Sequence, residues 1–339
     1  MNTSEAIARH RPHQDAGAAG LSDSSTRRTF LGACGAAALA GAVPLRASAA
    51  QGAREQDARR AFRFVFLPDI HLMHDLRSPQ GMEMALTAAD RLDPRPDFLV
   101  TGGDLIDSLR LKNLAQATEL ADLFTRIWSA NTDLPVHHMM GNHDPAGWSN
   151  DEYPREHPEF GYNLLQRRLP MPHLYYSFDY GAWHFVILHN IRLVEPGTYL
   201  SEFSEEQMTW LREDLSKHPE RPTILFGHFP PVTATEFLDG RAKVQEGAWT
   251  LSTQRMSRNP YDLVKAVEGA NIKAFLSGHI HRLDRVEVMG RTFICSGSVS
   301  GAKWRGHDHD TPEGITIVDC HPDGRFDYRY HDYGWNAAV

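Results

Sequence analysis

The sequence has little cysteine, no excess of basic residues and no long apolar run, and each of these features excludes a class of protein. Only 3 of the 339 residues are cysteine and no two form a C-x-x-C pair, which excludes a disulfide framework and a zinc ribbon. Lysine and arginine number 35 against 43 aspartates and glutamates, a net charge of -8. Because phosphate-backbone affinity comes from clustered basic residues, we expect no stable binding to nucleic acid.

The rest of the composition is that of a soluble globular protein with many histidines. Hydrophobic residues make up 41% and charged residues 23%, close to the average for folded domains, so wholesale disorder is excluded. A chain of this length can bury a large core in one or two domains. Its 19 histidines are many for such a chain and direct attention to metal chemistry.

Residues 22–49 have the features of an export signal. The pair Arg27-Arg28, followed by x-Phe-Leu, precedes a weakly apolar run, and a small-x-small cleavage site ends at Ala49. This arrangement resembles the twin-arginine signal. The apolar run has about 12 residues where a spanning helix needs about 20, so we expect no transmembrane anchor. We therefore expect a periplasmic or secreted protein, exported in folded form by the twin-arginine machinery.

After the predicted signal, residues 1–49, we expect a linker over residues 50–60 and one domain over residues 61–335, because no repeat or second linker interrupts this stretch. Cys295 and Cys320 each end an apolar β-like run and would meet an oxidising compartment. They could form a disulfide between paired strands or remain two buried thiols. The sequence leaves both interpretations open.

Short β-like runs alternate with segments of helical period. The runs that stop at a polar cluster are residues 62–67, 98–101, 135–140, 223–226 and 272–276. The helical segments between them are residues 83–92, 111–128 and 204–216, the last opened by a capping box from Ser204 to Gln207. The alternation predicts an α/β architecture, in which ligands gather at the carboxyl ends of the strands.

Each β-like run is followed by carboxylate, amide or imidazole side chains. The clusters are Asp69-Ile70-His71, Gly102-Gly103-Asp104-Leu105-Ile106-Asp107, Gly141-Asn142-His143-Asp144, Gly227-His228 and Gly278-His279-Ile280-His281. The Asp-x-His and His-x-His spacings let alternate residues reach one ion. The preceding glycines permit turns with positive φ that bring backbone and ligand close to a metal. Oxygen and imidazole donors without thiolate suit Mn, Fe, Zn or Co.

These five blocks, in this order, resemble the signature D-x-H, G-D-x-x-D/N, G-N-H-D/E, G-H and G-H-x-H of the calcineurin-like metallophosphoesterase superfamily. They extend over residues 69–281. The resemblance implies a four-layer α/β/β/α sandwich and a dinuclear centre of two divalent metal ions, Mn, Fe, Zn or Co. It also implies that a metal-bridging water or hydroxide attacks phosphorus in a small-molecule phosphoester substrate.

The resemblance assigns roles to the matching residues. One metal would be bound by Asp69, His71, Asp104 and His281, and the second by Asp104, Asn142, His228 and His279. His143, outside the metal set, resembles the family histidine that stabilises the transition state or protonates the leaving oxygen. Asp144, which we also expect at the catalytic site, or Asp107 could orient the His143 imidazole.

Departures from the family patterns narrow the branch. Ser108 follows Asp107, where protein Ser/Thr phosphatases of this superfamily have Arg, and the tyrosine ligand of purple acid phosphatases has no counterpart. The chain looks most like the bacterial phosphodiesterase group, which includes cyclic-nucleotide phosphodiesterases. We expect a phosphodiesterase; a phosphomonoesterase or a nucleotide pyrophosphatase with the same site is the alternative. A non-catalytic metal- or phosphate-binding protein is disfavoured, because no motif residue is lost.

Two further residues are candidates for substrate contact. His189 follows an apolar run, residues 185–188, and its imidazole could contact a phosphoryl oxygen or support a neighbouring ligand. Trp304 ends a loop rich in small residues, where it could stack on a base or be a core or lid aromatic. The charged residues beside it, Lys303 and Arg305, are candidates for the same reason.

Overall fold

The structure, a computed structural model, describes residues 60–337. The predicted twin-arginine signal and residues 50–59 of the predicted linker lie outside the described residues. No helix among residues 60–337 is long and apolar enough to cross a membrane.

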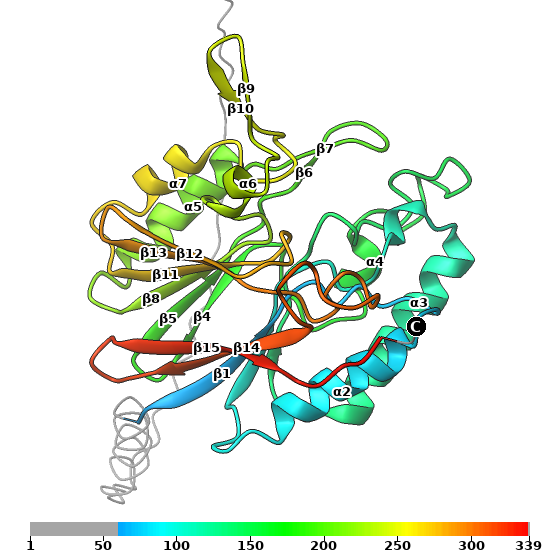
Figure 1. Ribbon diagram of the computed structural model, residues 1–339, viewed down its shortest axis with the longest axis horizontal. Helices are drawn as coiled ribbons and strands as arrows, with labels where there is room; N and C mark the ends of the chain where they lie inside the picture. The colour runs from blue at the N-terminus through cyan, green and yellow to red at the C-terminus, as the bar shows by residue number, and fades with distance from the viewer. Residues whose placement is uncertain (1–59, 338–339) are drawn as a thin grey trace, which may run out of the picture. The chain divides into compact units, whose positions relative to one another are not determined.

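The first sheet has five strands in the order β15-β14-β1-β2-β3 (Figure 1). They are β1 (Phe62–Leu67), β2 (Phe98–Thr101), β3 (Val136–His137), β14 (Gly314–Cys320) and β15 (Phe326–Asp332). Strands β1, β2 and β3 run parallel to one another, with Leu67 paired to Thr101. Strand β14 runs antiparallel to both of its neighbours, β1 and β15. All six residues of β1 are buried, as expected for the apolar run of a central strand.

The second sheet has six strands in the order β12-β13-β11-β8-β5-β4. They are β4 (Tyr176–Tyr180), β5 (Trp183–Ile187), β8 (Thr223–Phe226), β11 (Ile272–Ser277), β12 (Asp284–Val288) and β13 (Arg291–Cys295). The four inner strands run parallel, and an antiparallel strand closes each edge. The carboxyl ends of β8 and β11 therefore lie side by side.

Phenylalanines fill the space between the two sheets. The rings of Phe64 and Phe66 on β1 lie 5.8 and 5.6 Å from Phe226 on β8, and Phe64 lies 5.7 Å from Phe185 on β5. All four side chains are fully buried. Because aromatic side chains bury large apolar areas, this layer fixes one sheet against the other and so sets where their strand ends meet.

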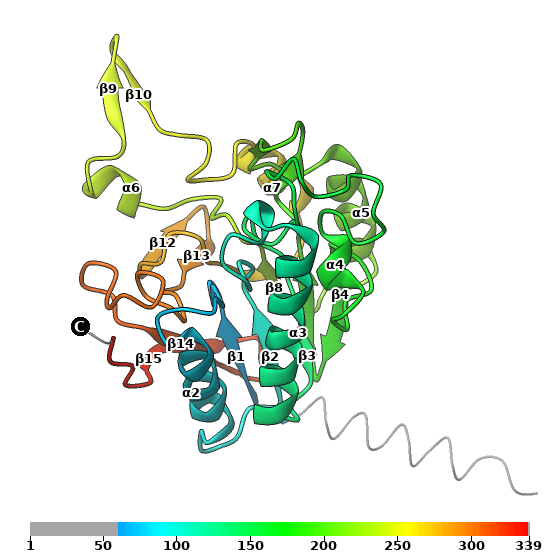
Figure 2. The ribbon, with the colours of Figure 1, turned by 90° about the vertical axis from the view of Figure 1, so that its right-hand side faces the viewer.

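Helices cover the outer faces of both sheets (Figures 1 and 2). Helices α2 (Ser78–Asp90) and α3 (Leu114–Asn131) cover the first sheet, and α5 (Glu205–Ser216) and α7 (Pro260–Ala266) the second. The arrangement confirms the predicted four-layer α/β/β/α sandwich. The smaller elements are η1 (Leu109–Leu111), α4 (Asn163–Gln166), β6 (Arg192–Leu193), β7 (Tyr199–Leu200), α6 (Thr235–Leu238), β9 (Lys243–Gln245) and β10 (Ala248–Thr250).

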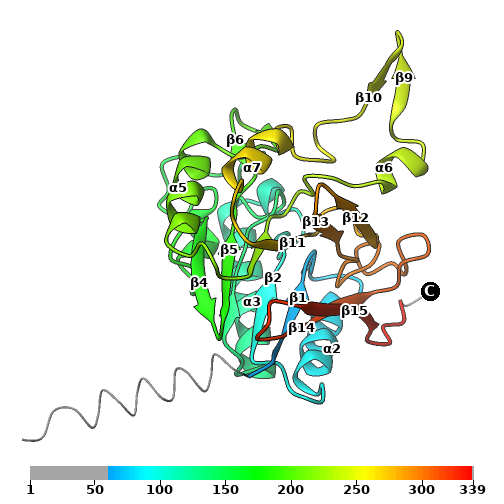
Figure 3. The same ribbon diagram turned by 90° about the vertical axis from the view of Figure 1, so that its left-hand side faces the viewer.

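Between β8 and α7 the chain makes an excursion that the sequence analysis did not anticipate. The segment of residues 233–259, named here the arm, contains α6 and the hairpin β9-β10. The hairpin projects away from the two sheets (Figure 3). Both strands of the hairpin are exposed.

The two cysteines of the domain are both buried and free. Cys295 ends β13 and Cys320 ends β14, which belong to different sheets. Of the two alternatives that the sequence left open, the structure therefore has two buried thiols. Burial raises the pKa of both well above the ordinary value, so they are inert as nucleophiles.

Candidate metal centre

The predicted ligands sit on sharply turned backbone just after the strands. Asp69, His71, Asp104, His279 and His281 all have positive φ, between 46° and 68°. Non-glycine residues seldom adopt this left-handed conformation, which costs of order 1–3 kcal/mol each and concentrates at functional sites. The sequence predicted positive φ at the preceding glycines, but in the structure it is mainly the ligand residues themselves that have positive φ.

The glycines serve mainly to let two segments approach. A Cβ at Gly141 would stand 2.1 Å from Asp104 Oδ1, and one at Gly278 would stand 2.3 Å from Asp69 Oδ2. No side chain larger than hydrogen fits at either place. The blocks that follow β3 and β11 can therefore close directly onto the carboxylates that follow β2 and β1.

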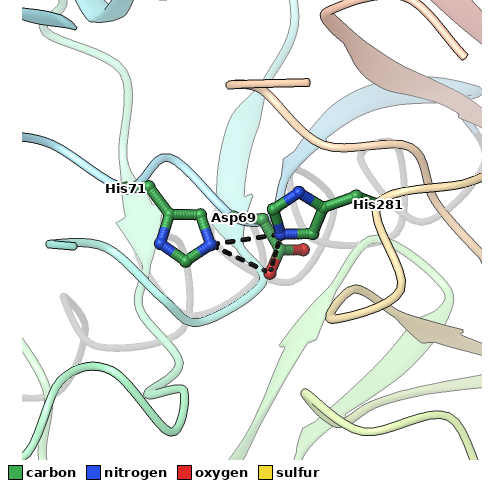
Figure 4. Close-up of side chains that lie close together, drawn as sticks. All are labelled: Asp69, His71 and His281. Carbon is green, nitrogen blue, oxygen red and sulfur yellow. Dashed lines mark hydrogen bonds and ion pairs between the residues drawn. The ribbon is translucent and has the colours of Figure 1, made fainter. Parts of the chain in front are cut away.

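Asp69, His71 and His281 form the first group of donors (Figure 4). His71 Nε2 lies 3.1 Å from His281 Nε2, and Asp69 Oδ1 lies 3.9 and 3.4 Å from these two nitrogens. Donor atoms about 2.1 Å from a shared ion are about 3 to 3.5 Å from one another. The three side chains thus point at one position with the spacing of metal ligands.

The second group gathers around Asp104, whose Oδ2 faces both groups. Asp104 Oδ2 lies 3.4 Å from His228 Nε2 and 3.7 Å from His71 Nε2. Asn142 Oδ1 lies 3.0 Å from His228 Nε2, and the donor atoms of Asp104, His228 and His279 are within 4.8 Å of one another. The shared oxygen of Asp104 is placed as a bridging ligand would be.

Backbone carbonyls fix which nitrogen His228 and His281 present to the site. His228 Nδ1 lies 2.8 Å from the carbonyl of Gly102, and His281 Nδ1 lies 2.6 Å from that of Gly301. A carbonyl only accepts, so Nδ1 of each ring donates and Nε2 is left for a metal. This is the usual support of a metal-binding histidine by a second hydrogen bond.

In Asp69 and Asp104, as in these histidines, one polar atom is held by the backbone and the other faces the site. Asp69 Oδ2 accepts the N–H of His279 at 2.8 Å and Asp104 Oδ1 accepts the N–H of His143 at 2.7 Å, leaving the other oxygen of each for the site. Among the described residues the buried Asp69 Oδ1 has no hydrogen-bond partner. An orphaned carboxylate oxygen at 0% exposure is costly unless an ion binds it. The donor set fits a pair of divalent cations.

Charges within the site shift its pKa values in opposite directions. Burial opposes ionisation of Asp104, but the imidazoles around it, His228 first, hold its pKa well below the ordinary value. For His228, burial alone would lower the pKa of the imidazole. The negative charge of Asp104 outweighs burial, so the pKa of His228 is raised to about 9. The carboxylates are therefore ready as anionic ligands.

His143 lies beside the donors, with its ring edge at the pocket. His143 Nε2 is 3.9 Å from Asp104 Oδ2, and Nδ1 accepts the backbone N–H of Ser108 at 3.1 Å. Because Nδ1 is the acceptor, the proton of the neutral ring is on Nε2. Of the two carboxylates considered as partners for this imidazole, Asp107 is the one nearby, with Oδ1 3.5 Å from Nδ1.

Asp144, predicted at the catalytic site, lies beneath the loops. It is fully buried and accepts the backbone N–H groups of Leu105, Ile106 and Gly141, at 2.9, 3.2 and 2.6 Å. Burial and the charge of Asp104 raise its pKa to about 8. Its carboxylate ties the block after β2 to the block after β3, so it shapes the site without facing the pocket.

An open pocket of about 330 Å³ lies over the donors. It is lined by His71, Asp104, His143, Arg241, Arg255, His279, Ile280, His281, Ala302, Lys303 and Asp308. Sequence reasoning missed Arg241 and Arg255, which belong to the arm. No motif or periodic pattern marks the arm, so only its length between the fourth and fifth blocks hinted that it could return to the site.

Of the candidates for substrate contact, Lys303 lines this pocket, whereas Trp304 and His189 do not. Trp304 is buried, its indole N–H donates to the carbonyl of His71 at 3.0 Å, and its ring packs where Gly81 leaves room. Of the two alternatives for Trp304, the structure therefore has the core aromatic, with the side chain 1% exposed. His189 packs edge-on against Tyr162, and burial lowers its pKa to about 4.

Comparison with known proteins gives a family for this arrangement. The model of the calcineurin-like phosphoesterase family matches residues 62–283. A probable cyclic nucleotide phosphodiesterase of Rhodococcus erythropolis is 26% identical over 192 residues, 55% of this chain and 52% of that protein. A serine/threonine-protein phosphatase, CPPED1, of Pongo abelii is 27% identical over 207 residues, 59% of this chain and 58% of that protein. The chain thus spans little more than half the length of these curated relatives.

Among solved structures, a dimetal phosphatase from Danio rerio superposes with a TM-score of 0.53. The two are 16% identical, and the match covers 80% of this chain and 99% of that one. At this identity the likeness shows the fold, in agreement with the sheet order described above. Since the family model matches most of the chain and its motifs form the donor cluster, the chain belongs to the calcineurin-like phosphoesterase family.

Proposed function

We propose that the chain is a two-metal phosphohydrolase that acts on phosphodiesters. The observation that carries the proposal is the convergence of seven donors at one site, with Asp104 Oδ2 shared between two groups and Asp69 Oδ1 left for an ion. Two divalent ions at these groups would supply a nucleophilic water of lowered pKa and neutralise charge on the phosphoryl oxygens.

The remaining chemistry falls to the protein. His143 presents an Nε2–H beside Asp104, where it can donate a hydrogen bond to a phosphoryl oxygen or to the departing alkoxide. The hydrogen bond from the Ser108 amide to Nδ1 favours the tautomer of His143 that has its proton on Nε2. Asp104 and Asp69, both held by backbone N–H groups, need no rearrangement to act as anionic ligands.

The charge next to His71 and His143 supports a diester over a monoester. Lys303, the cation whose charge reaches both His71 and His143, is neutralised by Asp107, with Nζ 2.7 Å from Oδ1. A diester carries one negative charge where a monoester carries nearly two near neutral pH. The relative named a cyclic nucleotide phosphodiesterase agrees with this choice, and the relative named a protein phosphatase makes monoesters the second candidate.

The test compares bis(4-nitrophenyl) phosphate with 4-nitrophenyl phosphate, using the full chain supplied with Mn²⁺, with and without a chelator. We expect faster, chelator-sensitive release of nitrophenol from the diester. Faster monoester cleavage would make the chain a phosphatase. Hydrolysis of neither ester, with both metals bound, would contradict the proposed activity.

We also propose that the protein is exported by the twin-arginine route, on the strength of Arg27-Arg28 and the cleavage site ending at Ala49. Replacing both arginines with lysine should leave the protein in the cytoplasm, as fractionation would measure. Unchanged export of the lysine variant would contradict the route.

A further inference from the structure

The arm brings two arginines to the mouth of the pocket. Arg241 and Arg255 line the same cavity as His279 and His281, so a molecule whose phosphoryl group lies at the donors can reach both guanidinium groups. A volume of about 330 Å³ is at the small end of ligand pockets. The arginines therefore face the part of a small substrate that extends beyond its phosphoryl group.

Arg255 is held by a buried carboxylate on one edge only. Its Nε and Nη2 lie 3.0 and 2.7 Å from the two oxygens of Glu236, which is 0% exposed. Burying a carboxylate is costly unless it is paired, so this ion pair fixes the guanidinium. Among the residues that the structure describes, Nη1 of Arg255 has no hydrogen-bond partner. The free edge of the fork is available to a ligand.

Arg241 repeats this arrangement at a more exposed position. Its Nε lies 2.9 Å from Oδ2 of Asp239, a carboxylate that Arg282 also contacts at 3.0 Å. Within residues 60–337 neither terminal nitrogen of Arg241 has a hydrogen-bond partner. Asp308, the carboxylate of the pocket lining that lies outside the donor set, is 3.4 Å from Arg282, so its charge is partly compensated.

A guanidinium held on one edge by a carboxylate is a preorganised anion receptor. Its remaining N–H groups match the planar oxygens of a carboxylate or phosphoryl group, and the held side chain loses little entropy on binding. We propose that Arg241 and Arg255 form a second anion subsite, so that preferred substrates are small phosphodiesters whose alcohol carries a carboxylate or phosphoryl group. The inference rests on the proposed phosphodiesterase activity and adds its substrate class.

The experiment uses three 4-nitrophenyl phosphodiesters that differ only in the tail of the other alcohol: 2-carboxyethyl, 2-carbamoylethyl and 2-phosphonoethyl. With the Mn²⁺-loaded full chain, we expect kcat/KM for at least one anionic tail to exceed that of the carbamoyl tail by about tenfold, the worth of one charge-assisted hydrogen bond. The tail that is preferred identifies the anion. No preference for either anionic tail would overturn the proposal.

Variants locate the preference. Arg241→Gln and Arg255→Gln should each lower the anionic-to-carbamoyl ratio by about threefold or more. Because Arg255→Gln strands the buried Glu236, the double variant Glu236→Gln/Arg255→Gln is measured beside it. Arg192→Gln is the matched control, since Arg192 pairs with Glu202 at 2.5 Å outside the lining of this pocket. A ratio unchanged in Arg241→Gln and in the double variant would contradict the subsite.

A binding measurement separates the subsite from the activity. Calorimetry compares 3-phosphonopropionate with 3-phosphonopropionamide, neither of which can be hydrolysed, on the same Mn²⁺-loaded protein. We expect the carboxylate to bind about tenfold more tightly and Arg241→Gln to remove most of the difference. If no ester is hydrolysed but this difference is present, the activity is wrong and the subsite is right. Equal affinities, together with no anionic preference in turnover, would overturn the subsite alone.

Discussion

At the scale of single residues, His143 has one ring nitrogen fixed by the backbone and the other turned toward the pocket. The Ser108 amide donates to Nδ1 at 3.1 Å. No side-chain carboxylate is needed to set the tautomer. His143 is therefore a positioned hydrogen-bond donor, whereas the other histidines of the site belong to the proposed donor set.

The first prediction follows from this difference. His143→Ala should retain both metal ions, because the ring is not in the donor set, while kcat on the diester falls by roughly 10²- to 10⁴-fold through loss of the donor. Metal content is measured by mass spectrometry alongside steady-state turnover. His74→Ala, which removes a half-exposed histidine outside the pocket lining, is the control and should leave both values unchanged. Loss of metal in His143→Ala would make His143 a ligand, and undiminished turnover would remove its catalytic role.

The sequence located the donors but not their orientations. Motif order alone placed Asp69, Asp104 and His281 at one site, because parallel strand ends must meet at one edge of a sheet. Which carboxylate faces His143 depends on backbone angles after β2 and β3, and the left-handed φ of Asp104 has no signature in the residue type. The burial of Trp304 likewise depends on space at Gly81, more than 200 residues away.

At the scale of elements, a buried histidine joins α5 to the edge of the second sheet. His184 on β5 is 1% exposed, and its Nδ1 and Nε2 lie 2.8 and 2.9 Å from Asp179 on β4 and Asp214 on α5. Burial lowers its pKa, but the two carboxylates outweigh burial and raise it above the ordinary value. With an acceptor at each nitrogen, the charged ring makes both hydrogen bonds and the neutral ring only one.

A pH dependence of stability follows, with its sign set by the raised pKa. Stabilisation by His184 is complete below the unfolded-state pKa of about 6.5 and is lost as the pH rises through the folded-state pKa. His184→Gln, whose side chain cannot be charged, should therefore lower the free energy of unfolding by about 3 kcal/mol at pH 6 and by less at pH 9. Urea unfolding of both proteins at each pH measures this. His218→Gln removes the ring stacked on His184, leaves both hydrogen bonds of His184 to its carboxylates in place and should show less pH dependence. Equal costs of His184→Gln at both pH values would contradict the charged ring.

The sequence predicted the bounds of helices and strands correctly where a clear local signal marks the end of the element. β1, β2 and β8 have their predicted bounds, since each apolar run stops at a polar cluster. Helix α2 begins earlier than predicted, at Ser78, because Pro79 suits a first turn. The capping box of α5 is half formed: Ser204 caps the helix, but the side chain of Gln207 bonds the backbone of His189 instead. Such long-range partners leave no periodic trace in the sequence.

At the scale of the whole described domain, the donor cluster lies where the two sheets meet. Asp69, Asp104 and Asn142 follow strands of the first sheet, and His228, His279 and His281 follow strands of the second. Each proposed metal group takes donors from both sheets. An ion bound at either group would therefore cross-link the two halves of the sandwich, in addition to the phenylalanine layer between them.

Metal binding should consequently stabilise the fold as a whole, and through Asp104 it should do so for both ions at once. At a Mn²⁺ concentration about a hundredfold above Kd, ligand linkage adds about 2.7 kcal/mol for each bound ion, a rise in Tm of roughly 5 to 10 °C per ion over the chelator-treated protein. Asp104→Asn should lose both ions together and most of this rise, because one carboxylate oxygen serves both groups. Asp323→Asn, in the exposed turn between β14 and β15, is the control and should keep the full shift. Calorimetry measures Tm, and metal analysis of the same samples counts the bound ions. A dinuclear site that survives in Asp104→Asn would show that the two groups bind metal independently. A wild-type Tm that does not change with Mn²⁺ would show that the ions do not join the sheets.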